Sequence, residues 1–424
     1  MTRGLMKTTS RFALATAAVG MMASGALAAD LGGNCCADLE ERVAELEATT
    51  ARKGNRKVTL TVYGHVNKAI MWHNSDEYDS FREGRATVYD NQASTSRFGF
   101  RGSAKIRPNL EVGYNIEVGV NENKNTNTNN ANTAFNVRHN YVYFDETRLG
   151  RVSLGQTSQV TDGLFGINLG NTMLTQLGTD ADGYLGAALE NTFGDVYDGA
   201  RRQGVYYRSP TVAGFVLGTG FSNGTRNGGL TDSADYWEAA LRYAGEFNGI
   251  RIAAGIGYRY EHFGHDATTA DDGFRNHVWL GSASTMHVPT GLFVSGGYGD
   301  IDSKDRFASQ RGWWLIAGLQ RNFFGLGAST LYGEYGKVNF KNNSYLFEYD
   351  PDDEPDVATR RSDGHYWGLG IVQTIDAAAM DVYLQYRKYD LDDGTFTNRD
   401  PESEDFYISD SDTSVIKAGA MIRF

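Results

Sequence analysis

The sequence predicts an all-β fold, a closed antiparallel transmembrane barrel of sixteen strands, and three observations support this prediction. The first is a period of two in hydrophobicity over about ten residues at a time, the length that a tilted strand needs to cross a membrane. The second is an alternation of short and long connections between these runs. The third is a secretory signal at the N-terminus, after which no apolar run approaches the roughly 20 residues of a spanning helix.

Composition narrows the class of protein without deciding it. The 424 residues include 51 glycines, 24 tyrosines and 22 phenylalanines but only 6 prolines. This mixture is typical of many strands with aromatic girdles and glycine-containing turns, although a soluble β-sandwich can have a similar composition. The formal net charge is −12. Since nucleic acids are bound mainly through their phosphates, so acidic a chain is expected to have no nucleic-acid partner.

Residues 1–28 have the features of a signal peptide. The three charged residues are all basic: Arg3, Lys7 and Arg11. Residues 12–25 are apolar with several small side chains, and residues 26–28 read Ala-Leu-Ala, which fits a small-x-small cleavage site. Cleavage there would leave a net charge of −12 − 3 = −15. The alternative interpretation is a buried N-terminal helix.

Residues 29–56 differ from everything after them, and we expect a periplasmic segment with a short coiled-coil helix. The four- and three-residue steps of a heptad are followed by Leu39, Val43, Leu46 and Thr50. About two heptads are marginal in isolation, so this coiled coil would depend on a larger trimer; the alternative is a single solvated helix. The adjacent Cys35 and Cys36 could bridge subunits in an oxidising compartment or be an incidental pair.

From Lys57 onward the hydrophobic period is two. The apolar face of one run consists of Leu110, Val112, Tyr114, Ile116, Val118 and Val120. That of another consists of Ile250, Ile252, Ala254, Ile256, Tyr258 and Tyr260. The first run, from Val58 to Trp72, is interrupted on its apolar face by Lys68. Strands of globular proteins average about five or six residues, so runs this long indicate strands that expose one face to lipid.

Sixteen such strands are predicted for residues 57–424. They start near residues 57, 96, 110, 135, 150, 201, 211, 235, 250, 276, 291, 312, 329, 364, 379 and 413. Short connections, such as residues 107–109 and 247–249, alternate with long polar ones, such as 121–133 and 337–364. An even strand number with turns at one end and loops at the other predicts periplasmic termini. The sheet must close on itself, because lipid cannot satisfy a free strand edge.

The last run ends the chain on an aromatic residue. Its apolar face carries Ile416, Ala418, Ala420, Ile422 and Phe424. A terminal aromatic after an alternating strand resembles the signal by which outer-membrane barrels are recognised for assembly. The resemblance therefore identifies Phe424 as the expected contact of the barrel-assembly machinery.

Several segments resemble the general porins. Residues 96–102 read Ser-Arg-Phe-Gly-Phe-Arg-Gly and resemble a run on an early porin strand. Residues 151–156 resemble the strand that enters the constriction loop, and residues 206–215 resemble the Tyr-x-Ser-Pro-x-x-x-Gly-Phe hairpin after it. Residues 35–57 resemble the entry of alphaproteobacterial porins. The resemblance spans nearly all of the chain after residue 28. It implies a homotrimeric outer-membrane pore whose third loop folds into the lumen.

Charged residues of the third loop and of the facing strands are the candidate pore-lining residues. The loop, residues 157–200, supplies the acids Asp162, Asp180, Asp182, Glu190, Asp195 and Asp198. The polar faces of strands supply the bases Arg97, Arg101, Lys105, Arg138, Arg208 and Arg259. Acids and bases that face each other across a narrow lumen would set a transverse field and an ion preference. Some of the acids could instead lie on solvated loop surface.

The expected function is passive diffusion of small hydrophilic solutes and ions, with no catalytic residue, cofactor or metal. Residues 220–224 match the esterase motif Gly-x-Ser-x-Gly, but a polar loop follows where that motif requires a helix. The alternatives are a substrate-specific channel, for which a ladder of lumen aromatics is expected, and an outer-membrane barrel enzyme. The remaining expected partners are outer-membrane lipid and lipopolysaccharide.

Overall fold

The computed structural model describes nine segments of the chain. They are residues 57–75, 86–120, 135–175, 197–225, 233–264, 274–303, 309–345, 357–393 and 411–424. The expected signal peptide, the periplasmic segment 29–56 and the cysteine pair lie outside the described residues. Among the described residues, no α-helix is long and apolar enough to cross a membrane.

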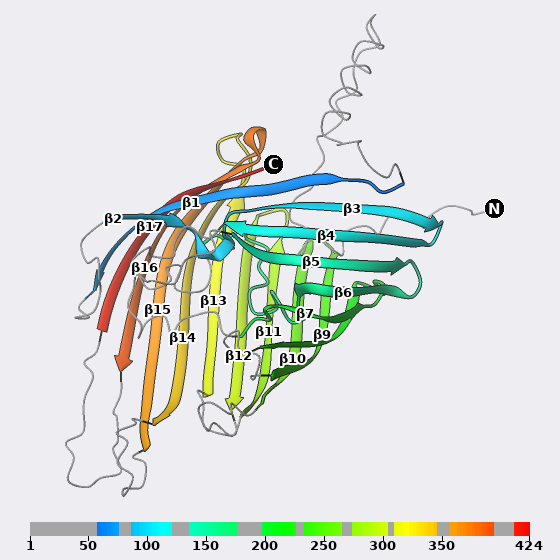
Figure 1. Cartoon of the computed structure of the whole chain (residues 1–424). Coiled ribbons are helices and arrows are strands. Elements are labelled where there is room, and N and C mark those ends of the chain that lie inside the picture. The colour runs from blue at the N-terminus through cyan, green and yellow to red at the C-terminus, as the bar shows by residue number, and fades with distance from the viewer. Residues whose placement is uncertain are drawn as a thin grey trace, which may run out of the picture.

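The described residues are almost entirely strands (Figure 1). The first nine are β1 (Thr61–Ser75), β2 (Ala86–Asp90), β3 (Arg97–Arg107), β4 (Leu110–Val120), β5 (Phe135–Glu146), β6 (Gly150–Ser158), β7 (Arg201–Arg208), β8 (Phe215–Thr225) and β9 (Ser233–Phe247). The others are β10 (Ile250–Phe263), β11 (Phe274–His287), β12 (Leu292–Ser303), β13 (Ser309–Arg321), β14 (Ser329–Tyr345), β15 (Val357–Ile375), β16 (Met380–Asp393) and β17 (Ser411–Arg423). Two short 3-10 helices are η1 (Gln92–Ser94) and η2 (Asp376–Ala378).

The strands form one closed antiparallel sheet. From β3 to β17 every strand pairs with its neighbour in sequence, and β17 pairs with β1. The last residue closes the ring: Phe424 N donates to Gly64 O at 3.0 Å, and Gly64 N donates to Phe424 O at 2.9 Å. Gly64 is required here, since a Cβ would lie 2.6 Å from the Phe424 ring. Closure leaves no free edge in the ring, as a barrel in lipid requires.

The predicted strand number is confirmed. The sheet has 17 strands, but β2 and β3 share one edge of β1, so the ring has 17 − 1 = 16 positions. β2 pairs with residues 68–72 of β1, and β3 pairs with residues 61–65. Most strands begin within a few residues of the predicted starts. β15 begins earlier, at Val357 instead of near residue 364.

The interruption between β2 and β3 was not predicted from the sequence. Residues 91–96, which include η1, are inserted opposite residues 66 and 67 of β1. The insertion lies on the lumen side, because the fully buried Asn91 donates to Tyr383 Oη at 2.7 Å and to Leu174 O at 3.0 Å. The second position of the ring is therefore a broken strand that fills part of the interior.

The outer surface is apolar and carries an aromatic girdle near the long-loop end. Cross-strand ring pairs join neighbouring strands, with centroids 4.7 Å apart for Tyr258 and Trp279 and 5.5 Å apart for Trp313 and Tyr335. The exposed Trp and Tyr side chains of β9 to β15 are Trp237, Trp279, Tyr298, Trp313, Tyr335 and Trp367. Amphipathic rings of this kind are typical of the boundary between hydrocarbon and water.

The two ends of the barrel differ as predicted. At one end the connections are tight, as between β9 and β10, where Asn248 and Gly249 have φ values of 49° and 76°. At the other end the connections are long, as between β6 and β7, which are separated by residues 159–200. Its described residues 159–175 turn into the ring of strands, as the resemblance implies (Figure 1).

Candidate functional site: the lumen and its inward loop

The inward loop, residues 159–200, is attached at its root to β9. The carboxylate of Glu238 is 4% exposed and accepts three hydrogen bonds: from Val160 N at 2.8 Å, from Thr161 N at 3.0 Å and from Thr161 Oγ1 at 2.6 Å. The first and last residues of the loop are joined by a hydrogen bond, in which Gln159 N donates to Ala200 O at 3.0 Å. The direction in which the loop leaves the wall is therefore fixed by hydrogen bonds.

The first half of the loop packs against the inner faces of β10 to β13. Leu164 is fully buried against β10, where a Cβ on Gly257 would lie 2.5 Å from its Cδ1 atom. Ile167 N donates to Ser282 Oγ at 2.9 Å, and Trp314 Nε1 donates to Phe165 O at 2.8 Å. Gly257 leaves room for the loop, while Ser282 and Trp314 form hydrogen bonds with its backbone.

The far end of the described loop is held by β16 and β17. Thr175 O accepts from Gln385 Nε2 at 2.6 Å and from Arg387 Nη2 at 2.8 Å. Leu174 O accepts from Lys417 Nζ at 3.3 Å in addition to its bond from Asn91. These contacts extend across the ring from β9 to β17, so residues 159–175 line one half of the interior.

Arg387 is also half of a fully buried ion pair. Its Nη2 atom lies 2.8 Å from Glu334 Oε2, and its Nε atom donates to Glu334 Oε1 at 2.9 Å. The two side chains are 3% and 0% exposed. Such a pair is costly to desolvate and is strongly destabilised if either partner is removed. Because Arg387 also binds Thr175 O, the ion pair couples the wall to the inward loop.

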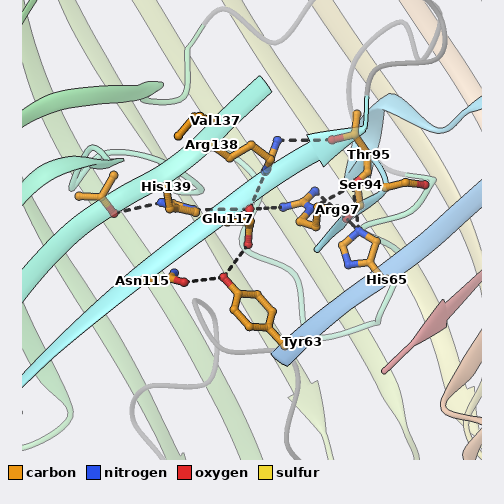
Figure 2. Close-up of polar contacts among 12 residues, drawn as sticks. Tyr63, His65, Ser94, Thr95, Arg97, Asn115, Glu117, Val137, Arg138 and His139 are labelled. Carbon is orange, nitrogen blue, oxygen red and sulfur yellow. Dashed lines mark hydrogen bonds and ion pairs between the residues drawn. The ribbon is translucent and has the colours of Figure 1, made fainter. Parts of the chain in front are cut away.

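The wall opposite the described part of the inward loop is basic. Figure 2 shows its most buried part, where side chains of β1, β3, β4 and β5 meet. Glu117 Oε1 lies between two guanidinium groups, 2.7 Å from Arg138 Nε and 3.7 Å from Arg97 Nη1. His139 Nε2 lies 3.8 Å from the same oxygen, and the Tyr63 hydroxyl lies 3.0 Å from Glu117 Oε2. Two permanent positive charges therefore share one carboxylate.

A β-bulge explains why Arg138 and His139 both point inward. In the pairing of β4 with β5, Glu117 faces His139 and Val118 faces Val137, so Arg138 is an extra residue. Strict alternation back from the outward Val142 would place Arg138 on the outer face. The bulge turns it to the lumen, as bulges often do beside functional sites.

The remaining predicted bases divide into two kinds. Arg101 and Lys105 follow Arg97 on the lumen face of β3, and Arg208 alternates with the exposed Val205 on β7. Arg97, Arg101, Lys105, Arg138 and Arg208 are together called the basic wall below. Arg259 is instead covered by the inward loop, where it is 4% exposed and its Nη1 atom donates to Tyr197 O at 3.1 Å.

Of the predicted acids, two lie in described residues. Asp162 is in the turn at the loop root, where Asp162 N donates to Gln159 O at 3.1 Å. Asp198 Oδ1 accepts from Phe165 N at 2.8 Å and so joins the two limbs of the loop. Asp180, Asp182, Glu190 and Asp195 lie outside the described residues.

Several lumen residues were not singled out from the sequence. They are Glu117, Glu238, Arg242, Glu334, Arg387 and Lys417. Each lies on the polar face of an alternating run, so its inward direction was predictable. Its partner was not. Glu117 pairs with the two neighbouring strands, and Glu334 pairs with Arg387 two strands away. Glu238, Arg242 and Lys417 bind the inward loop.

The esterase-like motif has no elbow. Residues 220–224 lie entirely within β8, and the fully buried Ser222 Oγ accepts from Gln159 Nε2 at 3.2 Å. A nucleophile elbow requires a sharp turn between a strand and a helix. Ser222 is thus a wall residue that contacts the loop root.

Comparison with known proteins gives a family and a set of similar folds. A family model described as "Gram-negative porin" matches residues 15–394. No curated protein matches the sequence. Three solved structures illustrate the shared fold. An anion-selective porin from Comamonas acidovorans has 16% identity and a TM-score of 0.57, covering 87% of this chain and 100% of its own.

The other two structures are also distant in sequence. The trimer form of OmpT, an outer membrane protein of Vibrio cholerae, has 15% identity, a TM-score of 0.54 and coverages of 87% and 99%. The outer membrane channel DcaP of Acinetobacter baumannii has 11% identity, a TM-score of 0.53 and coverages of 88% and 99%. At these identities the likeness establishes the barrel fold alone.

Proposed function

The chain belongs to the Gram-negative porin family and is a porin-type diffusion channel of the outer membrane. From this premise, we propose that solutes pass between the basic wall and the inward loop. One observation carries this assignment. Most hydrogen bonds of the described part of the loop go to the half of the interior between β9 and β17, and two others go to Ser222 of β8 and to Asn91. This half lies opposite the cluster of Arg97 and Arg138 on the basic wall. Barrels of about sixteen strands are wide enough to leave an aqueous channel.

The pore is proposed to pass small hydrophilic solutes without binding one of them tightly. A swelling assay on liposomes that contain the purified protein and uncharged sugars of increasing size tests this. The expected swelling rate falls smoothly with solute size and rises linearly with solute concentration. Saturation by one sugar at low concentration, or no swelling with the smallest sugars, would refute general diffusion.

A substrate-specific channel is the second candidate, and one observation favours it. On the lumen face of β5, the rings of His139, Tyr141 and Tyr143 follow one another, with centroids 6.0 and 6.3 Å apart. Arg151 lies over the last ring at 4.2 Å. Replacement of Tyr141 and Tyr143 by leucine distinguishes the candidates. A general pore keeps its relative sugar rates, whereas a specific channel loses saturation and selectivity.

The homotrimer, the orientation and the assembly route are also proposals. We place the termini and short turns in the periplasm and the long loops outside, with residues 29–56 beside the periplasmic end after removal of residues 1–28. The acidic loops would then face lipopolysaccharide, and the outward apolar belt would face lipid. An epitope inserted at residues 351–356 should be accessible on intact cells, whereas one inserted at residues 322–325 should not.

The assembly machinery is proposed to recognise the exposed Phe424. Deletion of this residue should reduce the amount of heat-modifiable barrel in the outer membrane. A control deletion within residues 29–34 should leave that amount unchanged. Equal yields of folded protein from both deletions would rule out this role of Phe424.

A further inference from the structure

Residues 91–96, called the inserted turn below, lie directly beside two arginines of the basic wall (Figure 2). Arg97 begins β3 and follows the turn immediately. Its Nε atom donates to Thr95 O at 2.9 Å, and its Nη2 atom donates to Ser94 Oγ at 3.2 Å. Arg138 reaches the same turn from β5, where its Nη1 atom donates to Thr95 Oγ1 at 3.4 Å. The inserted turn therefore contacts both guanidinium groups that share Glu117.

The inserted turn competes with Glu117 for the guanidinium of Arg97. Arg97 Nη1 lies 3.7 Å from Glu117 Oε1, whereas Arg138 Nε lies 2.7 Å from the same oxygen. A hydrogen bond between a guanidinium and a carboxylate is about 2.7–2.9 Å long, so Arg97 forms none with this oxygen. The Arg97 side chain is 18% exposed and that of Arg138 is 9% exposed. Arg97 is thus the less neutralised and the more accessible of the two cations.

The inserted turn is anchored on both sides of Thr95. Ser96 N donates to Asp90 Oδ2 at 2.8 Å, and Ser96 Oγ donates to Asp90 Oδ1. On β1, Asn67 N donates to Ser96 Oγ at 3.0 Å, and Asn67 Nδ2 donates to Ser94 O at 2.9 Å. Asp90 and Asn67 are both buried. Movement of Thr95 relative to β1 would therefore break buried hydrogen bonds, which is costly.

The beginning of the inserted turn is fixed from across the ring. Asn91 Nδ2 donates to Tyr383 Oη of β16 at 2.7 Å and to Leu174 O of the inward loop at 3.0 Å. Tyr383 Oη in turn donates to Asn67 Oδ1 at 2.9 Å. The hydroxyl of Tyr383 therefore joins the first residue of the turn to the strand that anchors its end.

We propose that the inserted turn determines the ion preference of the pore by holding Arg97 apart from Glu117. Ser94 and Thr95 carry no charge and act through Arg97, so they are positioning residues. The proposal rests on the proposed passage of solutes beside the basic wall. Without its bonds to the turn, the Arg97 guanidinium moves onto the Glu117 carboxylate. Its charge is then neutralised, and the permeability to anions relative to cations falls.

Ser94→Ala tests this role, because it removes the hydroxyl that accepts from Arg97 Nη2 and lies 3.3 Å from His65 Nε2. The reversal potential in a potassium chloride gradient should shift toward cation preference. The shift should be less than about fivefold in permeability ratio, the effect of one whole charge about 4 Å from the ion in water. The matched control is Ser295→Ala on β12, a buried serine that contacts Ser284 Oγ at 2.7 Å, and it should leave the reversal potential unchanged.

A double variant separates positioning from a merely structural role. Glu117→Gln alone should raise the relative anion permeability, because it removes a carboxylate from the lumen. Adding Ser94→Ala to Glu117→Gln should then cause no further shift, since no carboxylate remains to attract Arg97. A structural role of Ser94 predicts the same shift in both backgrounds.

Tyr383→Phe is a second variant, and its changed atom contacts neither arginine. It removes the hydroxyl that joins Asn91 to Asn67, so it should shift the reversal potential in the same direction as Ser94→Ala but by less. Heat-modifiability verifies that each variant has folded. The proposal is overturned if neither variant shifts the reversal potential, or if Ser94→Ala has an equal effect with and without Glu117.

Failure of this inference is distinguishable from failure of the proposed function. Native protein that carries no current in planar bilayers would remove the pore itself. Native protein and variants that all conduct with the same ion preference would keep the pore and remove the role of the inserted turn.

Discussion

The buried ion pair between Arg387 and Glu334 leads to the sharpest stability prediction. Arg387→Met keeps most of the side-chain volume and removes the guanidinium. Glu334 then retains one bond, from Gln385 Nε2 at 2.8 Å, in place of the three it accepts in the native protein. Thr175 O keeps only the bond from Gln385.

Removing one partner of a buried pair costs about 3–5 kcal/mol, because the other charge stays buried and unpaired. We expect a loss of this size in the free energy of unfolding, measured by urea titration of the barrel with tryptophan fluorescence. Adding Glu334→Leu to Arg387→Met should recover a large part of that loss, since no unpaired charge then remains.

The neighbouring residue provides the control. Lys388 points outward, and its Nζ atom lies 2.7 Å from Asp412 Oδ2 in a pair whose side chains are 34% and 46% exposed. Lys388→Met should change stability little, because exposed pairs contribute little. If Arg387→Met were as mild as Lys388→Met, or if the double variant were less stable than Arg387→Met alone, the reasoning about the buried pair would be wrong.

Three further predictions concern permeation and the loop. Arg138→Gln removes a lumen charge, so the permeability to anions relative to cations should fall. The decrease should be at most about fivefold, the effect of one charge about 4 Å from the ion in water. An unchanged reversal potential in a salt gradient would contradict this. Gly257→Val places methyl groups where Leu164 packs, so the loop should move into the pore, with lower conductance and a stability loss of about 1–3 kcal/mol. Gly333→Ala, whose Cβ would meet its nearest atom at 3.4 Å, is the control and should conduct normally. Glu238→Gln weakens three hydrogen bonds at the loop root, so open-channel current noise should rise and the free energy of unfolding should fall by about 1.5–3 kcal/mol. Unchanged current noise and unchanged stability would show that the loop is held by other contacts.

Much of the barrel was predictable because its driving force is local. Each spanning strand repeats the same alternation, so the outward Ile250 to Tyr260 series and the inward Arg251 to Glu261 series follow from the sequence alone. The strand number follows once the runs are counted. The last strand also keeps its predicted apolar face, since Ile416, Ile422 and Phe424 are all exposed.

The interruptions of the pattern were not predictable in the same way. No sequence pattern near residues 91–96 predicts that this insertion fills the space beside Tyr383, which is almost 300 positions away in the chain. The bulge at Arg138 shifts the alternation by one residue, which a period of two cannot indicate. The insertion depends on contacts that closure of the ring brings together, whereas the bulge depends on the local pairing of β5 with β4.

For the candidate site, the sequence predicts the direction of the charged side chains but not their contacts. The sign of the wall charges followed from the polar faces, and Arg97 and Arg138 do share one cluster. Arg259 has the same sequence pattern but lies beneath the inward loop. A periodic pattern gives the direction of a side chain, and only the path of the loop determines whether water reaches it.

Single-channel recording of the purified protein in a planar bilayer tests the central claim most directly, since that claim is a water-filled passage through a closed ring of strands. The expected record shows ohmic current steps whose size rises in proportion to salt concentration, with closures in groups of three. A folded, heat-modifiable protein that inserts into the bilayer and carries no current would contradict the account.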